Sequence, residues 1–336
     1  MRRLFAVILT FVAVFGAGWL SLRRPDIPFD TLETAYATPQ SQYFVLGEGR
    51  KVHYRDQGNP DGDVLVMVHG FAASLHTWQP WVRELESTYR IITIDLPGHG
   101  LTRGFDLEQI DIDGFIWVVD QLTEALEIDR FTLVGSSMGG HTAWSYAVEH
   151  GEKLDGLVLV GAAGWPNSPE EDESGALVFR LLEFPVARSI LKDLDVTAMI
   201  RSGLEDSFVD DEFVSEDMVQ RYAALNRAPG HRAAILHISG TTEDRPMANA
   251  QVLAGLSMPV LVIHGRSDNL VPVRHGDEFA RAIPDARLLI YEDAGHLPHE
   301  EVAVRSAGDL RAFLNDRVHR AAVAAEGPTG ETIGAD

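Results

Sequence analysis

Short, almost wholly apolar runs alternate with amphipathic stretches through most of this chain of 336 residues. Runs such as VLVMV, LVLV and VLVI are typical of strands buried on both faces, as in a parallel sheet that helices cover. Between the runs, apolar residues recur near helical period over Ile110–Leu126, and a second helical stretch, Gly139–His150, ends at the capping residue Gly151. The alternation predicts a doubly wound α/β domain with ligand sites beyond the carboxyl ends of its strands. The expected strands are Lys51–Asp56, Val64–Val68, Ile91–Ile94, Phe131–Val134, Leu157–Val160, Val260–Ile263 and Leu288–Tyr291.

The strand pattern stops between about Trp165 and Met258. Helical patterns replace it over Ala176–Lys192, Asp211–Asn226 and Ala233–Ser239. The simplest interpretation is a helical insertion between two core strands, here called the cap (165–258). Because an insertion at a strand's carboxyl end lies over the ligand-binding edge of such a sheet, we expect the cap to act as a lid.

The first 24 residues form a separate element. Leu4–Leu22 contains no charged residue and is flanked by two arginines on each side. A helix of this length spans about one hydrocarbon core, so we expect an uncleaved single-pass membrane anchor, with the catalytic domain on the periplasmic or extracellular side. A cleaved signal peptide stays the alternative. Beyond it we expect a linker (25–41), a core in two parts (42–164 and 259–320) around the cap, and a disordered tail (321–336).

Charge and cysteine content exclude several function classes. The chain has 28 Lys and Arg against 50 Asp and Glu, a formal net charge of -22, whereas nucleic-acid phosphates are held by clustered basic residues. We therefore expect no nucleic-acid partner. The absence of cysteine removes disulfides, thiolate metal sites and cysteine nucleophiles together.

A glycine-flanked serine follows one of the expected strands. The segment GSSMGG (135–140) comes directly after Phe131–Val134 and opens the next helix. Read as G-x-S-x-G, it places Ser137 at a strained strand-to-helix turn, where flanking side chains would collide with neighbouring chain. The serine then stands above the sheet at a helix N-terminus. Ser136 is the rival nucleophile, but that register would put Val134 and Met138 where the glycines belong.

A serine nucleophile needs a general base, and the base needs an acid that orients it. In this arrangement the acid and then the histidine are expected to follow the serine along the chain. Asp268 lies in the loop after Val260–Ile263, and His296 follows Leu288–Tyr291, so both come just past strand ends. We predict Asp268 as the acid and His296 as the base.

Three nearby residues are interpreted differently. Asp293 is closer to His296 in sequence, but it lies in the same loop and cannot easily reach behind the ring. His299 marks the start of the last helix. Asp95, in the turn-rich segment DLPGHG (95–100), is interpreted as structural, with contacts at the rim of the site.

The oxyanion of an acyl-transfer intermediate needs two backbone N–H donors. One is expected from Met138, directly after the nucleophile, and the other from the loop after Val64–Val68, where Phe71 is the best candidate. Gly70 lets the backbone approach the site. His69 is not interpreted as a metal ligand, because the chain has no H-E-x-x-H or comparable cluster. We expect neither a metal nor a cofactor.

Taken together, the motifs resemble those of the α/β-hydrolase superfamily from about Gln42 to about Val318. They are HGFAASLHTW (69–78), DLPGHG (95–100), GSSMGG (135–140), GRSDNLVP (265–272) and DAGH (293–296). The resemblance implies the α/β-hydrolase fold, a mostly parallel central sheet with helices on both faces and a helical cap. It also implies Ser137, Asp268 and His296 as a catalytic triad, with Phe71 and Met138 as oxyanion donors. Ser137 argues against epoxide hydrolases and haloalkane dehalogenases, which place Asp at the elbow.

The presence of an anchor and a helical cap is similar to membrane-anchored monoacylglycerol lipases and related bacterial lipases and esterases. This resemblance implies a carboxylic ester hydrolase acting through an acyl-enzyme on a small-molecule or lipid-derived ester. The cap segment Leu177–Phe184 has apolar surface for an acyl-chain pocket or for packing against the body. Two alternatives stay open: a serine-dependent carbon–carbon bond hydrolase of the same fold, and a non-catalytic hydrolase-fold binding protein.

Overall fold

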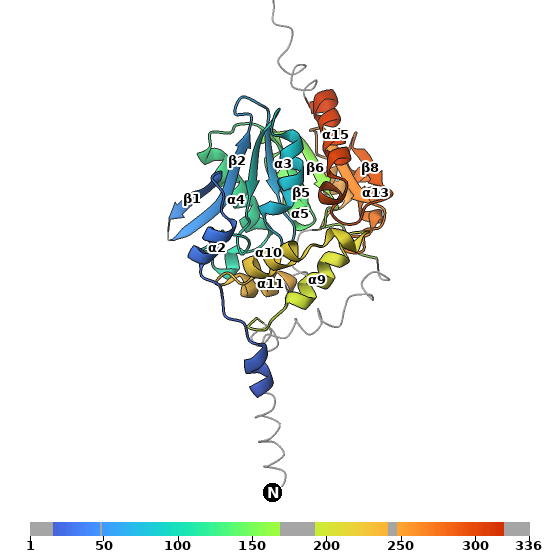
Figure 1. The fold of residues 1–336 in the computed structure, drawn as a ribbon. Coiled ribbons are helices and arrows are strands. Elements are labelled where there is room, and N and C mark those ends of the chain that lie inside the picture. Colours follow the sequence, from blue (N-terminus) through green and yellow to red (C-terminus); the bar gives the residue numbers. More distant parts are fainter. Residues whose placement is uncertain (1–15, 48, 169–191, 241–246, 319–336) are drawn as a thin grey trace, which may run out of the picture.

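The computed structural model describes residues 16–47, 49–168, 192–240 and 247–318, built around one sheet of eight strands in the order β1-β2-β4-β3-β5-β6-β7-β8 (Figure 1). β2 pairs antiparallel with β1 and with β4, and every other neighbouring pair is parallel. The predicted fold class, a mostly parallel sheet, is confirmed. The strands are β1 (Ser41–Gly47), β2 (Arg50–Gly58), β3 (Val64–Val68), β4 (Arg90–Ile94), β5 (Phe131–Ser136), β6 (Leu154–Val160), β7 (Val260–Gly265) and β8 (Arg287–Tyr291).

Each of the seven strands expected from apolar runs coincides with one of β2–β8. The sequence analysis missed β1, whose side chains alternate between exposed and half-buried positions, so that it contains no continuous apolar run. As an edge strand paired only with β2, it needs little apolar surface.

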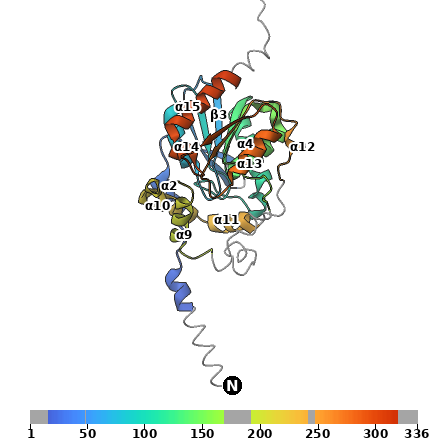
Figure 2. The same ribbon diagram turned by 90° about the vertical axis from the view of Figure 1, so that its right-hand side faces the viewer.

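Helices cover both faces of the sheet (Figure 2). One face packs mainly on α4 and α5, and the other on α3 and α15. The central strands divide their side chains between the two layers: in β3, Val66 and Val68 join the first layer, whereas Leu65 and Met67 join the second. Outside the cap, the helices are α2 (Phe29–Tyr36), η1 (Leu75–Trp78), α3 (Gln79–Leu85), η2 (Leu107–Gln109), α4 (Ile112–Ala125), α5 (Met138–His150), η3 (Gly151–Lys153), α13 (Val273–Ala282), α14 (Pro298–Glu301), α15 (Ala303–Phe313) and η6 (Leu314–Val318).

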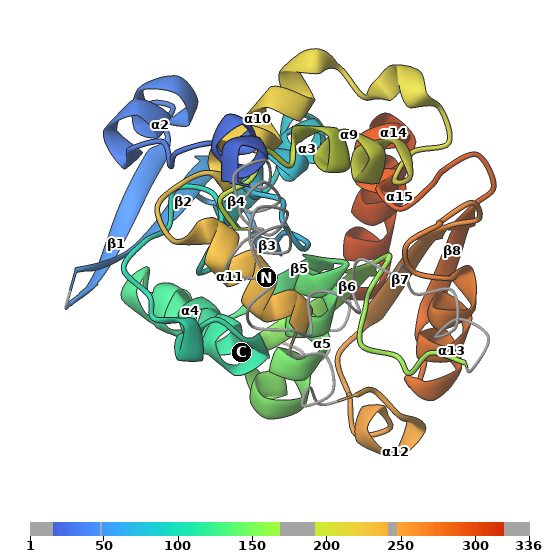
Figure 3. The same ribbon diagram turned by 90° about the horizontal axis from the view of Figure 1, so that it is seen from below.

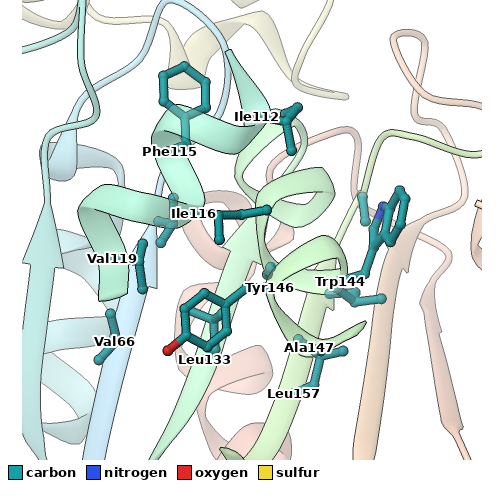
Figure 4. Packing of buried hydrophobic residues seen from close by; sticks show 14 of the residues in the cluster. Val66, Ile112, Phe115, Ile116, Val119, Leu133, Trp144, Tyr146, Ala147 and Leu157 are labelled. Atoms are coloured by element: carbon teal, nitrogen blue, oxygen red, sulfur yellow. The ribbon is translucent and has the colours of Figure 1, made fainter. Parts of the chain in front are cut away.

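The layer under α4 and α5 packs apolar side chains against β5, the strand that leads to Ser137 (Figure 4). Ile116 of α4 and Tyr146 of α5 meet above Leu133 of β5, and all three are almost completely removed from solvent. Burial of such a side chain contributes about 1.5–3 kcal/mol. The strand and helix on either side of the expected elbow are therefore held together by buried apolar contacts.

The segment 165–258 contains no strand among its described residues, 165–168, 192–240 and 247–258. Its helices are α9 (Thr197–Glu205), η4 (Asp211–Phe213), α10 (Glu216–Asn226), α11 (His231–Gly240) and α12 (Ala250–Leu253). Seen from below, α9, α10 and α11 lie over one end of the sheet (Figure 3). The expected helix Ala176–Lys192 and the apolar segment Leu177–Phe184 lie outside the described residues, apart from Lys192.

The structure contradicts the predicted membrane anchor. Residues 16–22 are helical, but no helix in the described part of the chain is long and apolar enough to cross a membrane. The first part of the predicted run, up to residue 15, lies outside the described residues. At its end the chain contacts the cap: Arg23 forms a β-bridge with Leu194, and the backbone N–H of Arg24 donates to the carbonyl of Asp193 (2.8 Å).

The segment 25–41, expected as a linker, contains helix α2. Leu32 of α2 is buried against Leu101 and against Leu225 of α10, so this helix touches both the core and the cap. Arg103 pairs with Glu33 of the same helix at 2.6 Å. The signal missed in the sequence is the spacing of Phe29, Leu32 and Tyr36, which lie on one helical face.

Candidate active site

Ser137 occupies the turn between β5 and α5 in a left-handed backbone conformation, with φ 53° and ψ -117°. Residues other than glycine are seldom found there. The adjoining glycines explain why the turn can form: a Cβ on Gly135 would lie 2.1 Å from the carbonyl oxygen of Gly139, and one on Gly139 would lie 2.2 Å from that of Val68. The rival Ser136 is 1% exposed, which leaves Ser137 as the accessible hydroxyl of the pair.

The predicted acid and base are in contact. Nδ1 of His296 lies 2.8 Å from Oδ2 of Asp268. Asp268 follows β7 and His296 follows β8, so two adjacent parallel strands carry the pair to the same edge of the sheet as Ser137. The backbone N–H of His296 donates to the carbonyl of Ser207 in the cap (2.8 Å), which ties the predicted base to the cap.

Asp268 is held as a carboxylate. Burial by itself would raise the pKa of its carboxyl, but His296 and the hydrogen bonds from His264 and His296 outweigh burial and hold that pKa well below its usual range. Its second oxygen, Oδ1, accepts from the backbone N–H groups of Leu270 (2.9 Å) and Val271 (2.8 Å). A fixed, ionised acid is what an imidazole base requires behind it.

The loop after β6 connects Ser137 to the His296–Asp268 pair. The N–H of Ser137 donates to Val160 at the end of β6, and Ala163 donates back to the carbonyl of Ser137, both at 3.0 Å. A Cβ on the intervening Gly161 would lie 3.3 Å from both Nδ1 of His296 and Oδ2 of Asp268. The nucleophile and the acid–base pair therefore share one loop as their common neighbour.

The expected oxyanion loop lies against the serine. A Cβ on Gly70 would lie 3.1 Å from Cβ of Ser137 and 3.7 Å from its hydroxyl oxygen, so the glycine permits the close approach. Nδ1 of His69 lies 2.7 Å from the carbonyl oxygen of Gly70, and Nε2 accepts from the backbone N–H of Leu96 (3.1 Å). Burial lowers the pKa of His69, so the neutral ring holds this loop. Phe71 follows directly, and Met138 begins α5; their N–H groups stay predicted donors.

Asp293, His299 and Asp95, which were not assigned to the triad from the sequence, have other partners in the structure. Asp293 is ion-paired with Arg305 at an exposed position. Nε2 of His299 lies 2.9 Å from the hydroxyl of Thr77, and burial lowers the pKa of His299 to about 3. The carboxylate of Asp95 accepts from Nδ1 of His53 (2.7 Å) and from two backbone N–H groups, which fixes the loops after β3 and β4. Asp95 is fully buried, so it does not reach the rim.

Two groups of residues near the site were not found from the sequence. His264 of β7 lies 3.1 Å from Oδ2 of Asp268. At the junction of cap and core, Thr77 of η1 donates to Glu300 of α14 (2.5 Å). Burial raises the pKa of the Glu300 carboxyl, although the hydrogen bond from Thr77 and the charge of Arg221 of α10 act in the opposite direction. For His264, the one signal in the sequence was a polar residue near the end of the otherwise apolar strand VLVIHG. No group of three or more metal-ligating side chains occurs within the described ranges.

A family model described as alpha/beta hydrolase fold matches residues 63–303. The chain belongs to this family. It is 29% identical over 266 residues to a 2-hydroxy-6-oxo-6-phenylhexa-2,4-dienoate hydrolase of Comamonas testosteroni, covering 75% of this chain and 87% of that protein. It is also 29% identical over 258 residues to a pimeloyl-[acyl-carrier protein] methyl ester esterase of Nitrosomonas europaea (74% and 93%). A solved esterase of a Rhodococcus species matches this hydrolase with a TM-score of 0.67 and 25% identity, covering 83% and 99% of the two chains.

Proposed function

We propose that this α/β hydrolase is a serine enzyme that cleaves a carbon–carbon bond beside a ketone in a small carboxylic acid. Ser137 is its nucleophile, His296 its general base and Asp268 the acid that orients the base. The observation that carries the catalytic part is the 2.8 Å contact between His296 and Asp268 beside the strained turn at Ser137. The choice of bond rests on the relatives, which favour it over the ester substrate expected from the sequence.

In this mechanism Ser137 attacks the ketone carbon while His296 accepts the hydroxyl proton. Asp268 stabilises the imidazolium, and the N–H groups of Phe71 and Met138 stabilise the oxyanion. The bond breaks in the keto tautomer of the hydroxydienoate, in which the proton of the 2-hydroxyl group has been replaced by one on the carbon beside the attacked ketone. Collapse of the tetrahedral intermediate then breaks the carbon–carbon bond, the electron pair enters the conjugated 2-carbonyl of the leaving fragment, and that fragment takes up a proton. Water then attacks the acyl-enzyme with help from His296 and releases a carboxylic acid.

The carboxylate of the substrate has a candidate partner in Arg221. The Comamonas relative acts, by its name, on a dienoate, which is a carboxylate. In this chain Nε of Arg221 is buried without a hydrogen-bond partner among the described residues. The positive charge of Arg221 acts to lower the pKa of Glu300, which lies four residues after His296. Because a guanidinium binds carboxylates in bidentate fashion, we assign Arg221 to the acidic end of the substrate.

Ester hydrolysis is the second candidate, favoured by the methyl ester esterase of Nitrosomonas and the Rhodococcus esterase. The same triad would serve it, because an ester differs only in expelling an alkoxide in place of a carbon fragment. A lipid-derived ester belongs to this second candidate.

The test compares two substrates on one purified enzyme. Disappearance of the coloured 2-hydroxy-6-oxo-6-phenylhexa-2,4-dienoate measures carbon–carbon cleavage, and release of p-nitrophenol from acetate and butyrate esters measures ester cleavage. The proposal expects kcat/KM for the dienoate to exceed that for the esters by at least about 100-fold, which is a difference of about 2.7 kcal/mol in transition-state stabilisation. Turnover of esters or monoacylglycerols alone would establish the second candidate. No turnover of either substrate, together with failure of a fluorophosphonate to label Ser137, would leave only a non-catalytic binding protein.

Arg221→Gln separates the substrate classes further. Loss of the guanidinium should raise KM for the dienoate about 10-fold or more, since a charge-assisted hydrogen bond contributes about 1.5–3 kcal/mol. The same variant should leave KM for neutral p-nitrophenyl acetate within about two-fold of the parent value. Equal effects on both substrates would mean that Arg221 supports the cap rather than the substrate carboxylate.

A further inference from the structure

His264 is a fully buried histidine inside a strand whose other interior residues are apolar. Its Nε2 lies 2.8 Å from the carbonyl oxygen of Val271 and 3.1 Å from Oδ2 of Asp268. Both partners are acceptors, so Nε2 must carry the hydrogen and share it between them. Nδ1 has no hydrogen-bond partner within the described part of the chain.

The carboxylate of Asp268 consequently receives four donors. Oδ1 accepts two backbone N–H groups from its own turn, and Oδ2 accepts Nδ1–H of His296 and Nε2–H of His264. The two histidines are also the charged or titratable groups that act on this carboxyl. His296, the proposed base, lies in the loop after β8. His264, in contrast, lies in β7, which pairs in parallel with β6 and β8.

The helix packed over β7 leaves room for this ring. Gly276 lies in α13, and a Cβ there would come 2.8 Å from Nδ1 of His264 and 3.2 Å from its Cβ. The imidazole of His264 therefore fits against α13 because Gly276 has no side chain. The same contact offers a way to displace the ring without changing its chemistry.

We propose that His264 is a positioning residue for the acid: its shared Nε2–H fixes the Asp268 carboxylate so that Oδ2 faces His296. The inference rests on the proposed triad. An apolar residue would satisfy the core at this place in β7 and would leave no orphan nitrogen. The side chain therefore has a purpose that packing alone does not explain.

Three substitutions of His264 separate the hydrogen bond from the packing. His264→Phe keeps a ring and removes the donor. His264→Gln restores an amide N–H at the position of Nε2, and His264→Asn, the matched control, places its amide at the position of Nδ1. Each variant is assayed on p-nitrophenyl acetate and on the dienoate, with the melting temperature measured in parallel.

If the proposal holds, His264→Phe lowers kcat about 10- to 100-fold while KM stays within about two-fold, because the acid acts only on the imidazolium that forms in the transition state. His264→Gln should recover most of that loss and His264→Asn should not. In the His264→Phe enzyme the far-downfield proton resonance of the His296–Asp268 hydrogen bond should broaden or move. A folded His264→Phe variant with parental kcat would overturn the proposal, as would His264→Gln as impaired as His264→Phe.

Gly276→Ala provides the second route should His264→Phe not fold. The added methyl group pushes the imidazole from its place, so kcat should again fall with KM unchanged. Parental turnover in folded Gly276→Ala would contradict the proposal. The proposed triad is tested separately, since Ser137→Ala and Asp268→Asn with normal turnover would refute the triad itself, whatever His264 does.

Discussion

At the scale of single residues, the site depends on one serine in a conformation that most residues avoid. The left-handed backbone at Ser137 persists because glycines stand where any side chain would strike the backbone of β3 or α5. The G-x-S-x-G motif predicts this turn because the glycines that permit it lie next to Ser137 in the sequence. The partners of Asp268 are less visible, since His264 becomes a neighbour of the acid only when the turn after β7 folds back on its strand.

Ser137→Ala is expected to remove turnover, with a loss of kcat on the order of 10⁶, while the melting temperature stays close to that of the parent. Ser136→Ala is the matched control, because Ser136 is buried and its loss should leave kcat within a few-fold. Single-turnover assays and fluorophosphonate labelling measure both variants. The opposite pattern, with Ser136 essential and Ser137 dispensable, would shift the motif register by one residue.

Asp268→Asn should keep KM and lower kcat by roughly 10⁴, because an amide donating toward His296 would favour the wrong imidazole tautomer. The turn should survive, since the remaining amide oxygen still accepts from Leu270 and Val271. Steady-state kinetics with a thermal melt of each protein check this. Unchanged kcat would place the acid elsewhere.

At the scale of elements, the cap and the core meet at a small polar junction between α10, η1 and α14. The hydroxyl of Thr77 donates to Glu300 and lies 2.9 Å from Nε2 of His299. Burial raises the pKa of the Glu300 carboxyl to about 7, although Thr77 and Arg221 act in the opposite direction. The charge state of this junction therefore changes near neutral pH.

The junction predicts a pH dependence of stability with a definite sign. Between the ordinary carboxyl value of 4.5 and about 7, the unfolded chain loses the Glu300 proton while the folded protein keeps it. The free energy of unfolding should therefore fall as pH rises through this window, by at most on the order of 3 kcal/mol. Glu300→Gln should remove this fall and be more stable than the parent at pH 8.

Thermal melts at pH 5 and pH 8 measure the effect. Glu86→Gln, at an exposed carboxylate, is the matched control and should keep the parental pH dependence. A Glu300→Gln protein that loses stability between pH 5 and pH 8 as steeply as the parent would show that Glu300 is ionised throughout.

Most of the sheet could be predicted from the sequence because buried parallel strands form continuous apolar runs. β1 was not predicted because the side chains of this edge strand alternate between exposed and half-buried positions. α2 was not predicted because its proline-flanked segment resembles a connection. The proposed triad residues could be picked out because each follows a strand, whereas Arg221 and Glu300 become neighbours only through the packing of the cap. The membrane anchor was wrong because an apolar run was weighed without the contacts that follow it.

At the scale of the whole molecule, the start of the described chain is fastened to the cap. Arg24 pairs with Asp195 (3.1 Å), Arg227 donates to the carbonyl of Pro25 (2.8 Å), and Arg232 pairs with Asp26 (2.6 Å). A single exposed ion pair contributes little to stability, but here ion pairs and backbone hydrogen bonds are formed by consecutive residues of the segment 23–26. Residues 23–26 thus form a strap along the cap, followed by α2 on the core.

Two truncations test the strap. Removal of residues 1–15 should leave kcat/KM on p-nitrophenyl acetate unchanged, because the strap stays complete. Removal of residues 1–26 should lower kcat/KM several-fold and speed proteolysis within 192–240, since the cap loses its ties to this segment. Identical activity and protease resistance in the two truncated proteins would show that the strap has no part in ordering the cap.

The fastening also decides what an experimenter can attach to this protein without disturbing it. We expect a fusion partner, affinity handle or surface tether joined just before the strap to load the cap, and this load would reach the predicted base His296 through the hydrogen bond from its backbone N–H to the carbonyl of Ser207. We therefore expect such a load to change turnover, although it is applied far from His296 in the sequence.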